Sequence, residues 1–435
     1  MTAPVRPGRE VLALAVPAFA TLVSEPLLQL ADSAIIGHLG TPQLAGLGIA
    51  GNIVGVLVGL CVFLAYGTTG LVARRMGAGD TRGALAAGVD GLGLAAVLGI
   101  VLTVALQVLV DPVVGLYRAS GDVAGYAVSY LRVVALAFPF LLVMLASTGV
   151  LRGLQDTRTP LKVTIGINVA NIGLNLALVY GAGLGILGAA LGTLIAQAVG
   201  STILAAVVLR GARKVGAPVR FRPWGIVGAA RAGAWLVLRS AALWLTLTAT
   251  TVVATRMGAI SLAAHQIVTS LWMFLAFALD ALAIAAQAIV GRYLGAGDAT
   301  TVRRITGMLV GWGVWFGVIL GAVVAATSAV TPMLFTPDES VRSIVSQVLL
   351  VVAAQLPIAG LVYLLDGVLI GAGDTRYLAL AGTVVALAYL PFAWAVSATG
   401  ASLAWLWAAY GVSMLGRAVV LGLRARGTAW QRLGI

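Results

Sequence analysis

The chain has few charged residues and almost no cysteine, and both shortages exclude classes of protein. Only 9% of its 435 residues are charged, whereas 61% are hydrophobic, and the mean hydropathy is +1.06. Soluble domains carry about a quarter charged residues, so the composition indicates a polytopic membrane protein. The one cysteine, Cys61, excludes a disulfide framework and a cysteine-based metal site. Because it lies in an apolar run, we predict that it is a small core residue.

Motifs for nucleotide binding and hydrolysis are also missing. The two lysines, Lys162 and Lys214, do not follow the glycine pattern of a Walker A motif, which excludes ATP-driven transport within this chain. No HExxH or GxSxG motif occurs. The two histidines, His38 and His265, fall near the expected external ends of helices. We expect both to be solvated or interfacial rather than metal ligands, and we expect no cofactor beyond a coupling ion.

Long apolar runs fill most of the chain. Each is near or above the roughly 20 residues that a helix needs to cross a bilayer. They predict an all-α polytopic membrane protein with about twelve transmembrane helices. The runs cover residues 11–36, 45–71, 84–110, 124–149, 161–181, 186–209, 233–255, 261–290, 305–329, 343–371, 377–396 and 400–422.

Most of the basic residues that give the net charge of +13 lie in the connections between these runs. If the N-terminus is inside, the external connections carry only Arg118, Arg132, Arg256 and Arg342 of the 27 basic residues. This is the positive-inside pattern. It predicts a plasma-membrane protein with both termini in the cytoplasm and excludes a nucleic-acid partner, leaving membrane lipid and a small molecule.

An internal repeat divides the chain into two halves. The sequence GAGD at 77–80 recurs at 295–298, an offset of 218 residues, and GVLRGLQDTR at 149–158 recurs as GVLIGAGDTR at 367–376. We predict two six-helix lobes related by a parallel repeat, with an N-lobe at 1–209, a cytoplasmic linker at 210–232 and a C-lobe at 233–435. The GAGD and DTR segments are typical of glycine turns followed by helix caps.

Polar residues inside the apolar runs of the first half are candidates for a site. Glu25 and Asp32 lie seven residues apart, so they share nearly one helix face, and Pro26 between them offers a bend. A carboxylate at membrane depth is costly and usually functional. Asp90, about two turns from the cytoplasmic end of its run, is expected to be interfacial instead.

Asparagines and two further acids complete the candidate set. Asn168, Asn171 and Asn175 lie three and four residues apart, so they line one helix face. They fit either interhelical hydrogen bonding or the wall of a cavity that holds Asp32. In the second half, Asp280 and Asp366 lie inside apolar runs, and Gln266 and Gln287 are near Asp280 in the sequence.

Four segments resemble the multidrug and toxic compound extrusion (MATE) family, in particular its DinF-like branch. They are LADSAIIGHLG at 30–40, the paired GAGD loops, and LDGVLIGAGDTR at 365–376. The resemblance implies twelve helices in two lobes, a central cavity, and antiport of organic compounds against H⁺ or Na⁺. It also implies ion-coupling or substrate-binding roles for Asp32, Asp280 and Asp366. Asn175 stands where family members often have Asp, which weakens the case for a Na⁺ site there.

We therefore expect a secondary antiporter that is a monomer and works by alternating access. Removal from water disfavours a charged carboxylate, so Asp32 is expected to take up a proton at neutral pH. One alternative is a flippase for lipid-linked precursors, which needs cationic residues in its cavity, and the expected spans offer almost none. Another is a membrane-embedded enzyme, which needs catalytic groups at one depth, whereas the acids here are divided between the halves.

Overall fold

The computed structural model describes residues 7–119, 121–220 and 222–434, and this part of the chain is helical with connecting turns and no strand. Within these residues, eleven helices are long and apolar enough to cross a membrane. The pair α5 (Gly121–Ala135) and α6 (Phe138–Gly153), bent by 54°, makes a twelfth if counted as one span. The expected all-α polytopic architecture with about twelve spans is confirmed.

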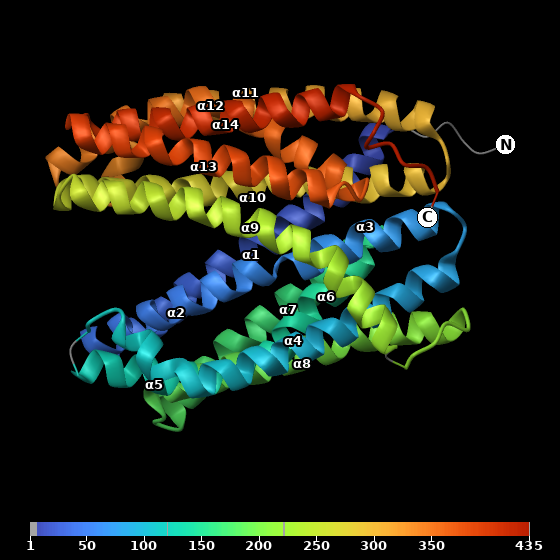
Figure 1. Cartoon of the computed structure of the whole chain (residues 1–435). Helices are drawn as coiled ribbons and strands as arrows, with labels where there is room; N and C mark the ends of the chain where they lie inside the picture. Colours follow the sequence, from blue (N-terminus) through green and yellow to red (C-terminus); the bar gives the residue numbers. More distant parts are fainter. Residues whose placement is uncertain (1–6, 120, 221, 435) are drawn as a thin grey trace. The chain divides into compact units, whose positions relative to one another are not determined.

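The elements alternate with short turns along the whole chain (Figure 1). Those of the first half, besides α5 and α6, are α1 (Pro7–Gly37), α2 (Thr41–Cys61), α3 (Phe63–Gly77), α4 (Thr81–Gly115), α7 (Arg158–Leu176), the π-helix η1 (Ala177–Gly181) and α8 (Gly185–Lys214). Those of the second half are α9 (Pro223–Arg256), α10 (Ala259–Gly295), α11 (Ala299–Thr327), the 3₁₀ turn η2 (Thr331–Leu334), α12 (Glu339–Gly371), α13 (Thr375–Thr399) and α14 (Leu403–Arg426).

The helices form two compact units whose limits differ from the predicted lobes at two places. One unit is Val16–Gly233, and the other joins the residues up to Ala15 with Ala234–Ile435. The start of α1 groups with the second half because Glu10 forms a 2.5 Å ion pair with Arg292 on α10. In addition, α9 begins at Pro223, inside the segment predicted to be a linker. Helix α9 therefore starts about ten residues before the expected lobe boundary.

In the unit that contains residues 234–435, α12 is the central helix and packs against α10, α11, α13 and α14 (Figure 1). Glycines bring α11 and α12 close together. A side-chain carbon on Gly313 would lie 2.7 Å from the carbonyl oxygen of Gly360, too near for any other residue. Small residues at such contacts are typical of membrane helices, which associate through close packing.

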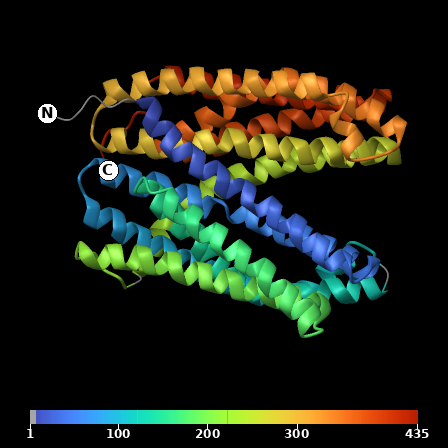
Figure 2. The ribbon, with the colours of Figure 1, turned by 180° about the vertical axis from the view of Figure 1, so that it is seen from behind.

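In the unit Val16–Gly233, α6 has the corresponding place and packs against α3, α4 and α8. The green helices of this unit run side by side in the view from behind (Figure 2). The hydroxyl of Thr69 on α3 donates to the carbonyl oxygen of Gly149 on α6 over 3.0 Å. Such hydrogen bonds between helices supplement packing where no water is available.

The internal repeat is visible in the backbone. Gly79 and Gly297, which are 218 residues apart, have the same positive φ of 76°, a conformation that favours glycine. The Asp that follows each of them caps the next helix: Asp80 accepts from the backbone N–H of Gly83 at 2.7 Å, and Asp298 from that of Thr301 at 2.9 Å. The predicted glycine turns and Asp caps are confirmed in the GAGD loops.

One span is continuous in the second half but bent in the first, because helix α12 corresponds to the bent pair α5 and α6. Helix α10 corresponds to α2 and α3, which are separated only by Val62 and form one span, Thr41–Gly77. The partner of Val62 at the offset of 218 is Asp280. The repeat therefore preserves the order of the helices but not their straightness.

Two polar residues of the apolar runs are buried by neighbouring segments. His265 is 1% exposed and therefore not solvated, because it faces α9, where its Nε2 lies 3.0 Å from the hydroxyl of Thr251. Asp90 is also buried, because the guanidinium of Arg222 covers it and forms an ion pair with it. That carboxylate raises the pKa of Arg222. His38 is exposed and Cys61 is buried, both as predicted.

Candidate functional site

Asp32 on α1 is held by an amide of α7 within the unit Val16–Gly233. Its Oδ1 accepts a hydrogen bond from Nδ2 of Asn175 at 2.7 Å. The same nitrogen also donates to Oδ1 of Asn171 at 3.1 Å, and Asn171 reaches the hydroxyl of Thr193 on α8 at 3.5 Å. Asp32 is half-buried, whereas Asn175 and Asn171 are 0% and 1% exposed. The structure therefore joins three of the predicted site residues in one network.

The helix geometry around Asn175 makes room for this contact. A side-chain carbon on Gly192 of α8 would collide with the amide oxygen of Asn175. The π-helix η1 starts two residues after Asn175, and the hydroxyl of Tyr180 in it donates to the carbonyl oxygen of Ile35 at 2.5 Å. Single π-turns often occur at functional sites because they change the direction of the following side chains.

Two other predicted site residues do not contact the carboxylate of Asp32. Asn168 donates instead to the backbone carbonyl of Ser24 at 3.2 Å, which ties α7 to α1. Glu25 is exposed and lies two helical turns before Asp32 on α1. The structure adds Tyr130 on α5, a buried residue near Asp32 and Thr193. No sequence signal identifies Tyr130, because nothing local relates positions 32 and 130.

The charge of Asp32 has no basic counterpart. In the described ranges, no lysine, arginine or histidine forms an ion pair with it. Its hydrogen-bond donor is a neutral amide, which stabilises a carboxylate less than a guanidinium does.

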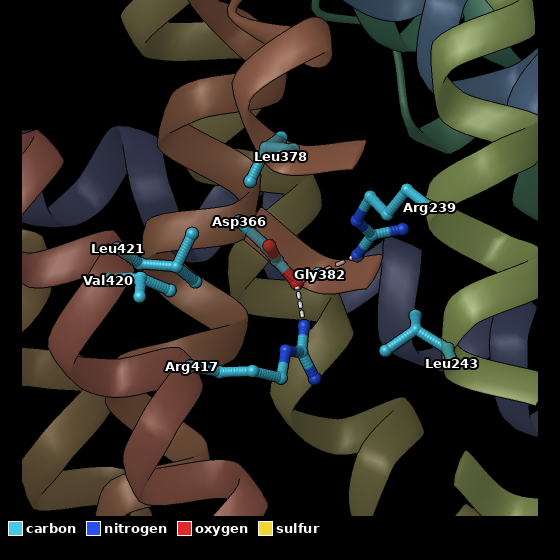
Figure 3. A pocket seen from close by; sticks show the side chains of 8 residues that line it. All are labelled: Arg239, Leu243, Asp366, Leu378, Gly382, Arg417, Val420 and Leu421. Carbon is cyan, nitrogen blue, oxygen red and sulfur yellow. Dashed lines mark hydrogen bonds and ion pairs between the residues drawn. The ribbon is translucent and has the colours of Figure 1, made fainter. Parts of the chain in front are cut away.

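The second half contains a different arrangement, centred on Asp366 of α12 (Figure 3). Its Oδ2 accepts from Nη2 of Arg239 on α9 at 2.8 Å and from Nη2 of Arg417 on α14. The side chains of Asp366, Arg239 and Arg417 are only 6%, 11% and 10% exposed. One carboxylate from the middle of the unit therefore holds two buried guanidinium groups from the neighbouring helices.

Sequence reasoning missed the two arginines of this cluster. Arg239 and Arg417 fall inside the apolar runs 233–255 and 400–422, not in the connections that the positive-inside pattern accounts for. The expectation that the spans offer almost no cationic residues overlooked them. The signal was present, because a basic residue inside a span is as costly as an acidic one.

Asp280 lies in the same unit as this cluster. Asp280 is half-buried on α10, and Tyr363 of α12 lies near both Asp280 and Asp366. Tyr363 precedes Asp366 by three residues, so the two lie on one face of α12. Gln287, expected near Asp280, is 1% exposed and lies seven residues further along α10.

The repeat shows how the Asp32 network differs between the halves. The partners of Asp32 and Asn171 at the offset of 218 are Thr250 and Tyr389. Their hydroxyl groups are buried and lie 2.7 Å apart. The second half therefore keeps the contact between the two helices but has lost the charge.

The cluster around Asp366 is charged in the second half and has no charged counterpart in the first. The offset partners of Arg239, Asp366 and Arg417 are Thr21, Thr148 and Val199, none of which is charged. Each half thus has ionisable groups where the other half is neutral. Among the described residues, no group of three His, Cys, Asp or Glu side chains could hold a metal ion.

These features define a class of protein. A bundle of apolar helices in two parallel repeats, with ionisable groups at membrane depth in both, is the architecture of a secondary transporter. The model of the MatE family matches residues 17–177 and 236–395, and the chain belongs to this family of multidrug and toxic compound extrusion transporters.

Individual relatives agree with this assignment. The chain is 31% identical to the chloroplastic protein DETOXIFICATION 44 of Arabidopsis thaliana over 396 residues, which cover 87% of this chain and 74% of that one. It is 30% identical to DNA damage-inducible protein F of Escherichia coli over 411 residues, covering 87% and 85%.

Solved structures share the fold. The bent form of the Vibrio cholerae MATE transporter VcmN superposes with a TM-score of 0.87 at 22% identity, covering 97% of each chain. A MOP superfamily transporter from Pyrococcus furiosus superposes with a TM-score of 0.88 at 20% identity, covering 97% of this chain and 95% of that one. At this identity the likeness concerns the fold alone.

Proposed function

We propose that the protein is a secondary antiporter that exports organic compounds in exchange for H⁺, with Asp32 as the coupling carboxylate. The observation that carries the proposal is the hydrogen bond from Asn175 to Asp32, which forms no ion pair within residues 7–119, 121–220 and 222–434. A carboxylate at membrane depth without a counter-charge is costly as structural glue. It is accounted for if Asp32 binds and releases a cation during transport.

The network favours a proton over Na⁺. Asn175 presents an N–H donor to Asp32, whereas hard cations such as Na⁺ need several oxygen ligands. The amide oxygen of Asn175 is buried and has no hydrogen-bond partner among the described residues. Rotation of the amide would place this oxygen opposite a protonated Asp32, which could then donate to it. Asn175 would thus form a hydrogen bond with the carboxyl group of Asp32 in both its charged and its protonated state.

The remaining roles follow from this assignment. Asn171 and Thr193 hold the amide of Asn175, Asn168 fixes α7 to α1, and Glu25 adjusts the field at Asp32. We propose a monomer in the plasma membrane, with both termini in the cytoplasm, that exposes its site alternately to the two sides. Asp280 belongs to the substrate path of the second half.

Proteoliposomes that contain the purified protein and an internal pH dye test this proposal. With either a pH or a Na⁺ gradient imposed separately, we expect added substrate to move protons and the pH gradient alone to drive accumulation. Ethidium and fluorescein, a cationic and an anionic dye, serve as substrates. If only the Na⁺ gradient drives accumulation, the proton is excluded as the coupling ion. If neither gradient drives accumulation, antiport is excluded.

A lipid-linked precursor flippase remains the second candidate, for a specific reason. The sequence argument against it was the lack of cationic residues, and the structure shows buried Arg239 and Arg417. Loss of fluorescence from an anionic labelled lipid on addition of dithionite measures flipping. Protein-dependent flipping without any ion gradient would favour this candidate over the antiporter.

A further inference from the structure

We propose that Arg239 and Arg417 form a binding site for the anionic group of an organic substrate. The carboxylate of Asp366 binds the two arginines while no substrate is present. The inference deepens the proposed export function and names the chemical class of the substrate. Its residues all lie in the unit that contains Ala234–Ile435.

The way the arginines bind Asp366 is the first argument. Both guanidinium groups contact the same oxygen, Oδ2, each through Nη2. The contact from Arg417 is therefore not the two-bond fork in which Arg binds a carboxylate most strongly. Moreover, Nη1 of Arg417 faces the sulfur of Met414 at 3.9 Å, and a thioether is a weak acceptor. A second anion would give Arg417 a stronger partner than it has.

The surroundings of the cluster are the second argument. Arg239, Asp366 and Arg417 line a small pocket of about 10 Å³, which has room for about one water molecule (Figure 3). The rest of the wall is almost entirely apolar, comprising Leu243, Leu378, Gly382, Val420 and Leu421. A molecule with one anionic group and an apolar body matches the chemistry of this wall, and it enters when the helices around the pocket move apart.

Gly382 on α13 provides a third argument. A side-chain carbon built on it would meet no atom within 4 Å, so the glycine borders open space. Most glycines at helix contacts in this unit, such as Gly313, are instead required by the close approach of another helix. Gly382 thus leaves space at the edge of the pocket without being needed for packing.

Asp366 makes the site suitable for transport. Buried arginines without an anion would carry a large desolvation cost. Asp366 supplies that anion when no substrate is bound, and the substrate anion takes over part of its contacts when it arrives. The arginines therefore keep a partner in both states, and the affinity for substrate is limited by competition with Asp366, which favours release.

Benzoate is a suitable probe because it has one carboxylate on an apolar ring. Its binding to the purified full-length protein is measured by titration calorimetry, with neutral benzamide and cationic benzylammonium as comparators of equal size. We expect benzoate to bind and the two comparators not to bind. Equal binding of benzoate and benzamide, binding of benzylammonium instead, or no binding of benzoate would overturn the proposal.

Variants then assign the binding to this pocket. R417Q should weaken benzoate binding by about tenfold or more, and it leaves the pair of Arg239 and Asp366 to keep the fold intact. D366N should strengthen the binding, because it removes the competing carboxylate. A merely structural cluster predicts no gain of affinity in D366N, so a loss or no change there in a folded protein would overturn the proposal.

Gly382→Leu tests the pocket without changing any charge. It should abolish benzoate binding by filling the space, whereas Gly307→Leu on α11, which also meets no atom within 4 Å, is the matched control. Unchanged binding in Gly382→Leu would contradict the site even if the charge variants fail to fold. These measurements use no gradient, so failure of antiport in proteoliposomes and failure of this site are separate results.

Discussion

Nδ2 of Asn175 lies 2.7 Å from Oδ1 of Asp32, although 143 residues separate the two in the chain. The contact joins the first span of the unit Val16–Gly233 to its fifth. Asp366, by contrast, is bound by two arginines in the other unit. An amide-held acid can exchange a proton without disturbing an ion pair, and an acid between two guanidinium groups cannot. The two halves of the repeat thus offer different chemistry.

Replacement of Asp32 by Asn should abolish transport driven by a pH gradient. The variant keeps the size of the side chain and its capacity to form hydrogen bonds but cannot carry a proton. Expression and substrate binding should therefore be retained, while accumulation in proteoliposomes falls to the level of passive leakage. An Asp32→Asn protein that still concentrates substrate against its gradient would contradict the coupling role.

Replacement of Asn175 by Ala should impair coupling far more than replacement of Asn168 by Ala. Asn175 donates a hydrogen bond to the carboxylate of Asp32 on α1, whereas Asn168 donates to the backbone carbonyl of Ser24, also on α1. Loss of a hydrogen bond to a charged group costs about 1.5–3 kcal/mol. The dependence of transport rate on pH, measured for both variants, should change in Asn175→Ala and stay as in the unmodified protein in Asn168→Ala. Equal behaviour would show that the asparagines act only as links between helices.

Replacement of Gly192 by Ala should reproduce part of the Asn175→Ala effect without removing a polar group. The added methyl would collide with the amide oxygen of Asn175 and turn the amide away from Asp32. Gly173→Ala, which meets no atom within 4 Å, is the control. We expect a shifted pH dependence of transport in Gly192→Ala alone, and the prediction fails if both variants match the unmodified protein.

Replacement of Gly225 by Ala should destabilise the protein, whereas Gly228→Ala should not. A methyl at Gly225 would collide with the carboxylate of Asp90 and disturb its pair with Arg222, whereas one at Gly228 meets no atom within 4 Å. Overpacking costs about 1–3 kcal/mol. Thermal unfolding of the detergent-purified variants, followed by intrinsic fluorescence, measures the difference. Matching unfolding temperatures would show that the pair of Asp90 and Arg222 adjusts without cost.

The linker and both termini should lie in the cytoplasm. A cysteine placed at Arg213, in a Cys61→Ala background, should react with a permeable maleimide but not with an impermeable one added to intact cells. Arg118→Cys, on the side expected to be external, should react with both reagents. Labelling of position 213 from outside would overturn the topology drawn from the distribution of basic residues.

The sequence by itself determined the number of spans, the repeat, and the glycine turns and Asp caps of the GAGD loops. These features are local: an apolar run of sufficient length, a glycine turn with an Asp cap, or a motif recurring at a fixed offset does not depend on distant residues. Asp80 and Asp298 cap their helices for this reason. Resemblance to the MATE family added ion-coupling or substrate-binding roles for the acids at positions 32, 280 and 366.

Only the tertiary structure decided which side chains meet. Arg239, Asp366 and Arg417 come from three helices, separated by 127 and 51 residues, and their contact depends on how each helix is rotated against its neighbours. The weak amphipathicity of a membrane helix does not fix that rotation, since lipid-facing and core-facing residues are both apolar. For the same reason His265 lies inside the unit instead of at its surface. The bend between α5 and α6 is absent from α12, although Pro139 and Pro357 are partners at the offset of 218, so the repeated sequence does not specify it.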